Sequence, residues 1–308
     1  IRAVIVTDAM QLLLYLFCIG LGMYCVMDEL SLTFGSVFSL IPAADLSFVS
    51  TGLGGGAAKL FGSYNLLTGV IGGAFLSFAS HATDHLLVQR VLACRDVDSA
   101  RKAMVASGLV VILQIALFLL FGLFIKVLLG ARPFDSSDSI VPYFIVNHLP
   151  VGLRGLMLAG IFAAAMSTLS SSINSLSSST ALDLLRLDER SMPERKKLAV
   201  ARGISLFWTL AIIAVSILFH DSKNPLVEVG LSIASVTYGG MLGIFILGRF
   251  VPGVDDRSAL CGVFAGVVAV TAVLLFTTLF WLWYVAVGFF VCVAVAIVAG
   301  RAFSWGLR

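Results

Sequence analysis

The sequence predicts an all-α protein built as a polytopic bundle of membrane-spanning helices. Hydrophobic residues make up 59% of the 308 residues and charged residues only 12%, whereas about a quarter of the residues in a soluble domain are charged. The charges gather in short segments between long apolar runs, which is the pattern of membrane spans. The net charge of +3 is too small and too scattered to indicate a nucleic-acid partner, so the expected partner is a lipid bilayer.

Eight segments are predicted to span the membrane, within a single membrane domain over residues 1–308. Each is close to the ~20 residues that cross a bilayer, or longer and therefore tilted. Prolines such as Pro42, Pro150 and Pro252 mark the breaks between them. The predicted spans are 3–26, 64–90, 103–129, 152–182, 199–219, 226–250, 258–278 and 280–300.

The chain begins with Ile1, and residues 1–6 are already mostly apolar. No positively charged leader followed by a small-residue cleavage site is visible, so no signal peptide is expected. We expect the chain to be a fragment that starts inside or just before a span.

Loop charges predict the orientation of the spans. If the first span starts in the cytoplasm and the spans then alternate, most Lys and Arg residues lie inside, while Asp and Glu divide almost evenly. A bias in basic but not in acidic residues is what the positive-inside rule describes. The sequence therefore predicts a cytoplasmic C-terminus and a plasma (inner) membrane location.

The segment 152–182 carries the most informative polar pattern. Ala164, Ser167, Thr168 and Ser171 recur at i, i+3, i+4 and i+7, so they share one helix face. In a structural interpretation, small residues let helices approach closely and each hydroxyl bonds the carbonyl one turn back. In a functional interpretation, the hydroxyls are ligands for a hard cation such as Na⁺, which prefers oxygen.

Asp8 lies in the first predicted span and needs a partner there. A carboxylate in a membrane helix costs at least about 2.5–3.5 kcal/mol, so it should face the protein interior. Arg2 at the membrane surface is one partner for it. A cation bound between Asp8 and the serine face of 152–182 is the other, and we favour it.

The segment 64–90 ends with a second membrane-embedded acid, Asp84. Either Arg90 neutralises it near the cytoplasmic interface, or it belongs to an inner gate. His81 lacks a second ligand at metal-binding spacing, so a metal site is disfavoured. His81 could instead line a solute cavity together with Ser77 and Ser80, which lie within one turn of it.

Two further spans carry uncharged polar residues. Gln114 stands alone among apolar residues of the span 103–129, and we favour a helix–helix hydrogen bond over a solute contact for it. The span 226–250 is the next most polar after 152–182, and a glycine pair within it allows close packing or local unwinding around a cavity. Its polar side chains include Ser232, Ser235, Thr237 and Tyr238.

Three motifs of the chain resemble the sodium:solute symporter family, which includes sodium/glucose, sodium/monocarboxylate and sodium/vitamin cotransporters. AVIVTDAMQ (3–11) is similar to the family's fifth core helix, TDHLLVQRVLA (83–93) to the end of the sixth, and LPVGLRGLMLAGIFAAAMSTLSSSINS (149–175) to the eighth. The resemblance implies a fold of two inverted repeats of five helices. This chain would hold core helix five, the second repeat and two further helices.

The resemblance also implies sodium sites. The main site would take the Ala164 carbonyl and the Ser167 and Thr168 hydroxyls, together with carbonyls of a first core helix that this chain lacks. Some members have a second site, whose counterparts here are Asp8, Ser170 and Ser171. One or two sodium ions are therefore expected per cycle.

The function that these features predict is sodium-coupled symport of a small organic solute by alternating access, without enzymatic activity. Sugar-transporting members carry Lys and Gln where Val111 and Leu231 stand here, which disfavours a sugar of that type. The expected solute contacts are Ser77, Ser80, His81, Gln114, Ser232 and Ser235, and the expected gate residues are Asp84 and Arg90.

Several alternatives stay open at this stage. The chain could couple to protons through Asp8 or His81, transport a sugar or sialic acid, or act as a sensor or channel on the same fold. A membrane hydrolase is disfavoured because neither a Gly-x-Ser-x-Gly nor a His-Glu-x-x-His motif is present. The solute and the oligomeric state are left undetermined.

Overall fold

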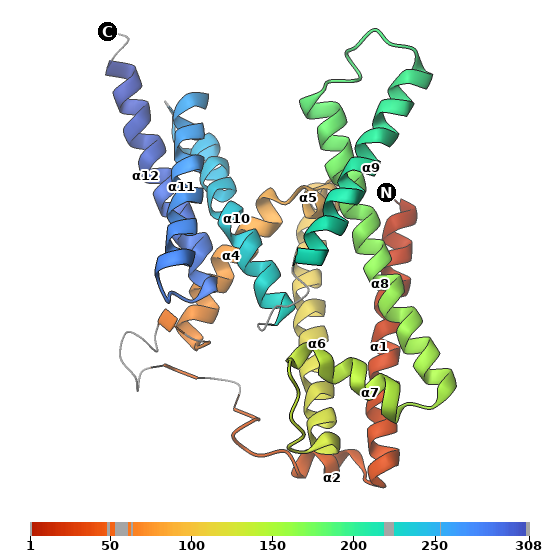
Figure 1. Cartoon of the computed structure of the whole chain (residues 1–308). Coiled ribbons are helices and arrows are strands. Elements are labelled where there is room, and N and C mark those ends of the chain that lie inside the picture. Colours follow the sequence, from red (N-terminus) through yellow and green to blue (C-terminus); the bar gives the residue numbers. More distant parts are fainter. Residues whose placement is uncertain are drawn as a thin grey trace. The chain divides into compact units, whose positions relative to one another are not determined.

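The computed structural model describes residues 2–47, 50–52, 61–62, 64–218, 225–252 and 254–305, and side chains over the same ranges except at 2–5, 85–86, 89–90, 218 and 303–305. Over these residues every regular element is a helix, so the predicted all-α class is confirmed. Figure 1 shows the course of the chain. The elements are α1 (Arg2–Leu30), α2 (Phe34–Ser39), the π-helix η2 (Thr68–Gly72), α4 (Gly73–Thr83), α5 (His85–Leu92), α6 (Val97–Leu129), the 3₁₀-helix η3 (Ser137–Ser139), α7 (Ile140–His148), α8 (Val151–Ser178), the π-helix η4 (Ser179–Leu184), α9 (Glu194–Leu218), α10 (Leu226–Phe250), α11 (Asp256–Phe276), the 3₁₀-helix η5 (Trp281–Trp283) and α12 (Tyr284–Trp305).

Seven helical segments in the described part of the chain are long and apolar enough to cross a membrane. They are Val6–Leu30, Val97–Leu129, Val151–Leu184, Glu194–Ile217, Leu226–Phe250, Asp256–Phe276 and Trp281–Ala302. Each overlaps one of the predicted spans, and their ends differ from the predicted ends by a few residues.

The remaining predicted span, 64–90, is not one continuous helix. It consists of η2, α4 and the start of α5, and α4 is separated from α5 at Asp84, whose backbone is extended (φ −73°, ψ 117°). Neither proline nor glycine stands at this break, so the sequence carried no signal for it. Whether this interrupted segment crosses the bilayer stays a prediction.

The helices form two compact units. The first comprises Ile1–Pro42 and Gln89–Lys223, which include α1, α2 and α6 to α9. The second comprises Ala43–Val88 and Asn224–Arg308, which include α4 and α10 to α12. The boundary between the units falls inside α5.

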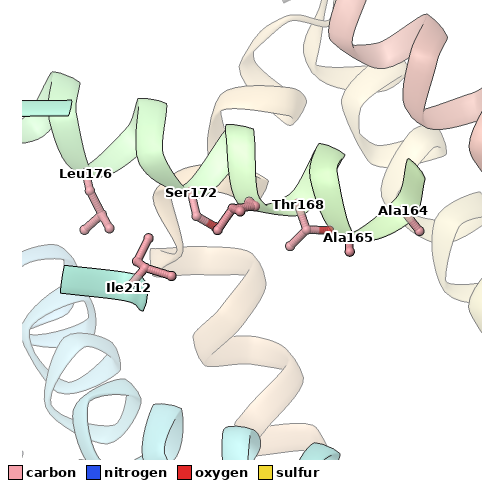
Figure 2. Close-up of a pocket in the computed structure, with 7 residues that line it drawn as sticks. Ala164, Ala165, Thr168, Ser172, Leu176 and Ile212 are labelled. Carbon is pink, nitrogen blue, oxygen red and sulfur yellow. The ribbon is translucent and has the colours of Figure 1, made fainter. Parts of the chain in front are cut away.

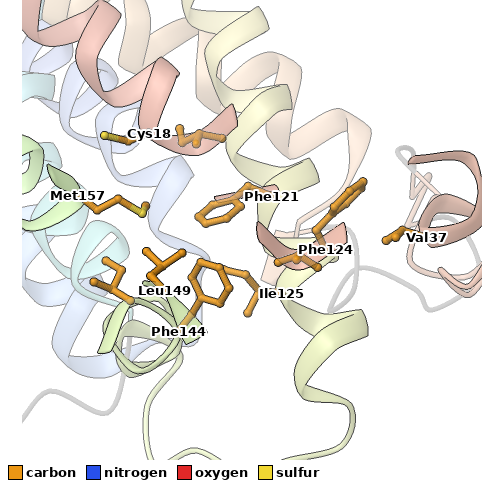
Figure 3. Packing of buried hydrophobic residues seen from close by; sticks show 11 residues of the cluster. Cys18, Val37, Phe121, Phe124, Ile125, Phe144, Leu149 and Met157 are labelled. Atoms are coloured by element: carbon orange, nitrogen blue, oxygen red, sulfur yellow. The ribbon is translucent and has the colours of Figure 1, made fainter. Parts of the chain in front are cut away.

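The core of the first unit lies where α6, α7 and α1 meet. Phe124, Ile125, Phe144 and Ile145 have no exposed surface, and the rings of Phe121 and Phe144 pack edge to face with centroids 5.7 Å apart. Figure 3 shows Phe121, Phe124, Ile125 and Phe144 converging with Leu149, which directly follows α7, with Met157 of α8 and with Cys18 of α1. Because lipid is as apolar as these side chains, close van der Waals packing rather than removal from water stabilises the contact between the spans.

The short helix α7 is also tied to α1 by polar contacts. Nδ1 of His148, the last residue of α7, lies 2.9 Å from a carboxylate oxygen of Glu29 on α1. The imidazole is also stacked on the ring of Phe144 in its own helix, with centroids 6.0 Å apart. The loop before α8 is therefore anchored at the C-terminal end of α1.

In the second unit, glycines let three helices approach until their backbones touch. A Cβ atom on Gly239 of α10 would lie 2.7 Å from the Val285 carbonyl oxygen of α12, and one on Gly266 of α11 would lie 2.8 Å from the Gly288 carbonyl oxygen. Real Cβ atoms do not approach other atoms this closely, so α10, α11 and α12 depend on these glycines.

Capping residues outside the membrane set where two of the long helices begin. The carboxylate of Asp96 accepts a hydrogen bond from the Ser99 amide at 2.7 Å at the start of α6, and Asp255 caps α11 through Ser258 in the same way. The bond from the Ser99 amide lowers the pKa of Asp96 below its usual value. Both caps keep the first turn of a span ordered at neutral pH.

Candidate functional site: the polar face of α8

Two polar contacts join α1 to α8 within the first unit. The Ser167 hydroxyl donates to Asp8 Oδ1 at 2.5 Å, and Gln11 Nε2 donates to the Ala163 carbonyl at 3.1 Å. Asp8 and Gln11 are three residues apart on α1, and Ala163 and Ser167 are four apart on α8. Each pair therefore lies on one face, and the order of the contacts makes the two helices antiparallel.

The same seam continues with apolar packing. Gly160 is buried, and a Cβ atom placed on it would sit 3.7 Å from Leu14 and from Cys18 of α1. Leu14 and Cys18 continue the face that begins with Asp8 and Gln11. The position of Asp8 against α8 is thus fixed by several turns of helix contact rather than by one hydrogen bond.

Thr168 projects to a different neighbour from Ser167. It lines an open groove of about 690 Å³ between α8 and α9. Figure 2 shows Thr168 and Ser172 on the α8 side and Ile212 on the α9 side. The residues that line the groove are Ala164, Ala165, Thr168, Leu169, Ser172, Leu176 and Ile212.

The helix α9 is held in place beside this groove by a hydrogen bond. The Trp208 indole N–H donates to the Thr180 hydroxyl at 2.9 Å, and that hydroxyl donates to the Leu176 carbonyl at 2.7 Å. Thr180 belongs to the π-helix η4, and π-helical turns are often found at functional sites. Ile212 lies one turn beyond Trp208, so this contact fixes the wall of the groove opposite Thr168.

The residues assigned to sodium from the sequence are thus only partly together. The structure joins Asp8 to Ser167, although the two had been assigned to different sites. Ala164 and Thr168 share the groove, Ser170 is exposed, and Ser171 is half-buried. Among the described residues no group of three or more His, Cys, Asp or Glu side chains could hold a metal. The oxygens that α8 itself offers to a hard cation are those of hydroxyls and carbonyls.

Gln114 of α6 lies in the first unit and contacts α1. Its side chain is half-buried and lies near Tyr15 of α1, whose ring packs 6.1 Å from Phe118 of α6. The helix–helix hydrogen bond that the sequence favoured for Gln114 over a solute contact stays a prediction.

The other residues expected at the solute lie in the second unit. His81 Nδ1 of α4 is 2.9 Å from the Ser77 carbonyl and 3.1 Å from the Ser80 hydroxyl, so the imidazole is turned back along its own helix. On α10, Ser235 is fully buried and donates to the Leu231 carbonyl at 2.7 Å, while Ser232 is half-buried. The Ser235 geometry is that of a packed helix hydroxyl.

The expected gate residue Asp84 has a partner on α10. The Tyr238 hydroxyl donates to Asp84 Oδ2 at 2.7 Å. The side chain of Arg90, the other expected gate residue, lies outside the part of the chain that is described. Its pairing with Asp84 therefore stays a prediction.

Two residues at these contacts had no assigned role in the sequence analysis. Gln11 stands three residues after Asp8, inside the motif at residues 3–11, and this spacing was the available signal. Tyr238 was recognised only as part of a polar helix, because nothing in the sequence places it near Asp84, 154 residues away.

Comparison with protein families decides the class of this protein. The model of the sodium:solute symporter family matches residues 1–266. The chain belongs to the sodium:solute symporter family. Its members are transporters, and with seven helices able to cross a membrane in its described part the chain is an integral membrane protein.

Curated relatives of this chain are named for different solutes. The sodium/sialic acid symporter NanT of Aliivibrio fischeri is 27% identical over 245 residues, which are 78% of this chain and 48% of that protein. The human sodium/iodide cotransporter is 29% identical over 228 residues, 70% of this chain and 35% of that protein. A putative sodium-dependent multivitamin transporter of Drosophila melanogaster is 30% identical over 210 residues, 63% of this chain and 34% of that protein.

A solved structure shares the fold. The match with a Na⁺-coupled sialic acid symporter in a substrate-bound, outward-open state covers 98% of this chain and 62% of that chain, with a TM-score of 0.75 and 22% identity. The predicted transporter fold is therefore confirmed. The chain spans about half or less of the length of the curated relatives named above.

Proposed function

We propose that the whole protein is a sodium-coupled symporter that carries a small organic solute by alternating access across the plasma (inner) membrane. Membership of the family supports this function. The observation that carries it is the contact between Asp8 and Ser167, which places a carboxylate against the hydroxyl-bearing face of α8. That face would gain nothing from lipid, whereas oxygen atoms gathered around a desolvated Na⁺ replace its water.

The main sodium site would use the Ala164 carbonyl and the hydroxyls of Ser167 and Thr168. Thr168 lines the groove beside α9, so the remaining oxygens would come from a helix that occupies this groove and that the chain does not contain. A second ion would use Ser170 and Ser171 with Asp8.

Asp8 would also act through Ser167. A serine hydroxyl has one proton and two lone pairs, so Ser167 can donate to Asp8 and accept a cation at the same time. Donation to a carboxylate increases the negative charge on the hydroxyl oxygen and fixes its direction, as carboxylates do for other metal ligands. Asp8 would thereby strengthen the main site even when no second ion is bound.

Sodium would drive transport by binding unequally to the two access states. The membrane potential contributes about 2.3 kcal/mol per charge per 100 mV for an ion that enters the cell. An ion that binds the outward-facing form more tightly shifts the population toward that form before the solute arrives. Rocking of one helix group against another would then expose the sites to the cytoplasm.

The proposed solute is a small organic molecule, and an organic anion fits best. Val111 and Leu231 offer no hydrogen bond at the two positions where sugar-transporting members carry Lys and Gln. The Ser77, Ser80 and His81 stretch of α4 offers polar atoms in its place, of which Ser77 and His81 are exposed.

The first test measures sodium binding without needing the solute. Purified full-length protein is melted in NaCl, KCl and choline chloride at one pH, and bound ²²Na⁺ is counted. We expect Na⁺ alone to raise the melting temperature. Ser167→Ala and Thr168→Ala should each raise the half-saturating sodium concentration by about tenfold, because each removes one oxygen ligand.

Ser107→Ala is the matched control, because Ser107 lies on α6 and its hydroxyl bonds only the Met104 carbonyl among the residues that the structure describes. It should bind sodium as the wild-type protein does. Equal melting temperatures in all three salts, or uptake in vesicles that follows a proton gradient with no sodium present, would contradict sodium coupling.

Asp8→Asn separates one bound ion from two. If Asp8 only orients Ser167, the variant binds sodium more weakly but with an unchanged Hill coefficient. If Asp8 holds a second ion, the Hill coefficient falls to about one. A coefficient near one in the wild-type protein, unchanged by Asp8→Ala, would exclude the second ion.

A further inference from the structure

The break between α4 and α5 is built on one residue. The Asp84 amide donates to the Ser80 carbonyl at 3.1 Å and so closes the last turn of α4. The Asp84 carbonyl accepts hydrogen bonds from the amides of Leu87 and Val88 at 3.1 and 2.9 Å, and these bonds form the first turn of α5. Its extended ψ of 117° turns the chain between these two sets of bonds, so rotation at Asp84 alone redirects α5.

The side chain of Asp84 is hydrogen-bonded to α10. The Tyr238 hydroxyl donates to Asp84 Oδ2 at 2.7 Å, a length typical of a bond to a carboxylate. The backbone at Tyr238 is held in place, because the next residue, Gly239, packs against the backbone of α12. α4 packs on α10 nearby, through buried Ala79 and Leu242.

The Tyr238–Asp84 hydrogen bond lies at the C-terminal ends of two polar stretches, one on α4 and one on α10. On α4, Ser77, Ser80 and His81 all lie within two turns before Asp84, and on α10 Ser232 and Ser235 lie within two turns before Tyr238. All five had been expected to contact the solute. The hydrogen bond therefore joins the two helices just beyond the C-terminal ends of these stretches, on the side that the loop charges place toward the cytoplasm.

The break at Asp84 lies close to a boundary between the two compact units. Val88 is the last residue of this part of the second compact unit, and Gln89 already belongs to the first. The chain passes from one unit to the other after Pro42, after Val88 and after Lys223, and the second of these crossings follows Asp84 by four residues.

We propose that the Tyr238–Asp84 hydrogen bond is a latch that holds the hinge at Asp84, and that its release lets α5 turn and opens the cytoplasmic end of the solute pathway. Tyr238 is then a positioning residue for the gate and touches neither sodium nor solute. The latch itself is a property of α4, α5 and α10, and its role in transport rests on the proposed function.

Hydrogen exchange on the full-length protein in lipid nanodiscs tests the latch. Tyr238→Phe removes the hydroxyl and keeps the ring. We expect the peptide that contains the Leu87 and Val88 amides to exchange about tenfold faster in this variant, since bonds to charged groups hold local structure by roughly that factor or more. The matched control is Tyr284→Phe, because among the described residues the Tyr284 hydroxyl makes no hydrogen bond.

A double variant tells a latch from a loosened helix packing. Asp84→Ala removes the acceptor, so adding Tyr238→Phe to it should change exchange in 85–92 very little. Wild-type exchange in Tyr238→Phe would overturn the latch, and so would equal acceleration by Tyr284→Phe or additive effects in the double variant. None of these measurements requires transport, so absence of sodium-driven uptake would remove the proposed function while the latch is judged separately.

Discussion

Ser167 and Thr168 are adjacent in sequence but about 100° apart around α8, and this difference separates their neighbours. Ser167 meets Asp8 on α1, and Thr168 opens on the groove beside α9. A single ion can contact both hydroxyls only from between these two directions. The geometry therefore explains why a site at this place would need oxygens from a further element in the groove.

The sequence predicted the shared face of α8 but not which residue on it meets Asp8. The spacing of Ala164, Ser167 and Thr168 follows from helix geometry alone. The partner of Asp8 depends on how α1 is shifted along α8, and that register is set by packing around Gly160 between segments far apart in the chain. For this reason the sequence left Arg2 and the serine face as alternatives.

Gln114 offers a prediction at the scale of one residue. If Gln114 joins α6 to α1 by a hydrogen bond with the nearby Tyr15, Gln114→Leu and Tyr15→Phe should each lower the unfolding free energy by about 0.6–1 kcal/mol. The measurement is thermal unfolding of the full-length protein, with KM for the solute as a second readout. A raised KM at unchanged stability in Gln114→Leu would instead place Gln114 at the solute.

At the scale of elements, long apolar runs were predictable and interruptions were not. Hydropathy marks the seven long helices because each is apolar along its length. The segment 64–90 has the same composition, yet it contains a π-helix and a break at Asp84. The residue at that break contacts a tyrosine of α10, and no local pattern reveals such a contact.

The glycines of the second unit give a prediction for helix packing. Gly266→Ala should destabilise the protein by about 1–3 kcal/mol, because its Cβ would lie 2.8 Å from the Gly288 carbonyl oxygen. Gly248→Ala is the control, since a Cβ there meets nothing within 4 Å. Alanine at position 248 should be neutral or slightly stabilising. Equal unfolding temperatures for the two variants would contradict the close packing.

At the scale of the whole molecule, the orientation in the bilayer was predicted from loop charges. The span Val151–Leu184 has 34 residues, or about 50 Å of helix, which is enough to carry its two flanking loops to opposite faces of a membrane. The basic loop that follows it should be cytoplasmic, and the acidic loop before α7 should be outside.

Labelling of introduced cysteines measures this orientation. In intact cells an impermeant maleimide should label Ser137→Cys but not Glu189→Cys, and permeabilised cells should label both. Both positions are exposed in the structure, so access to reagent rather than burial decides the result. The wild-type protein corrects for the native thiols, of which Cys261 is exposed. The reverse pattern would invert the proposed topology.

The contact of α10 with α11 and α12 through bare backbone has a consequence for motion. Helices separated by flexible side chains can slide by small rotamer changes, but helices whose main chains touch cannot shift without collision. We therefore expect these three helices to tilt together as one rigid group. If the hydrogen bond between Asp84 and Tyr238 breaks, this rigid group and α5 can move independently of each other.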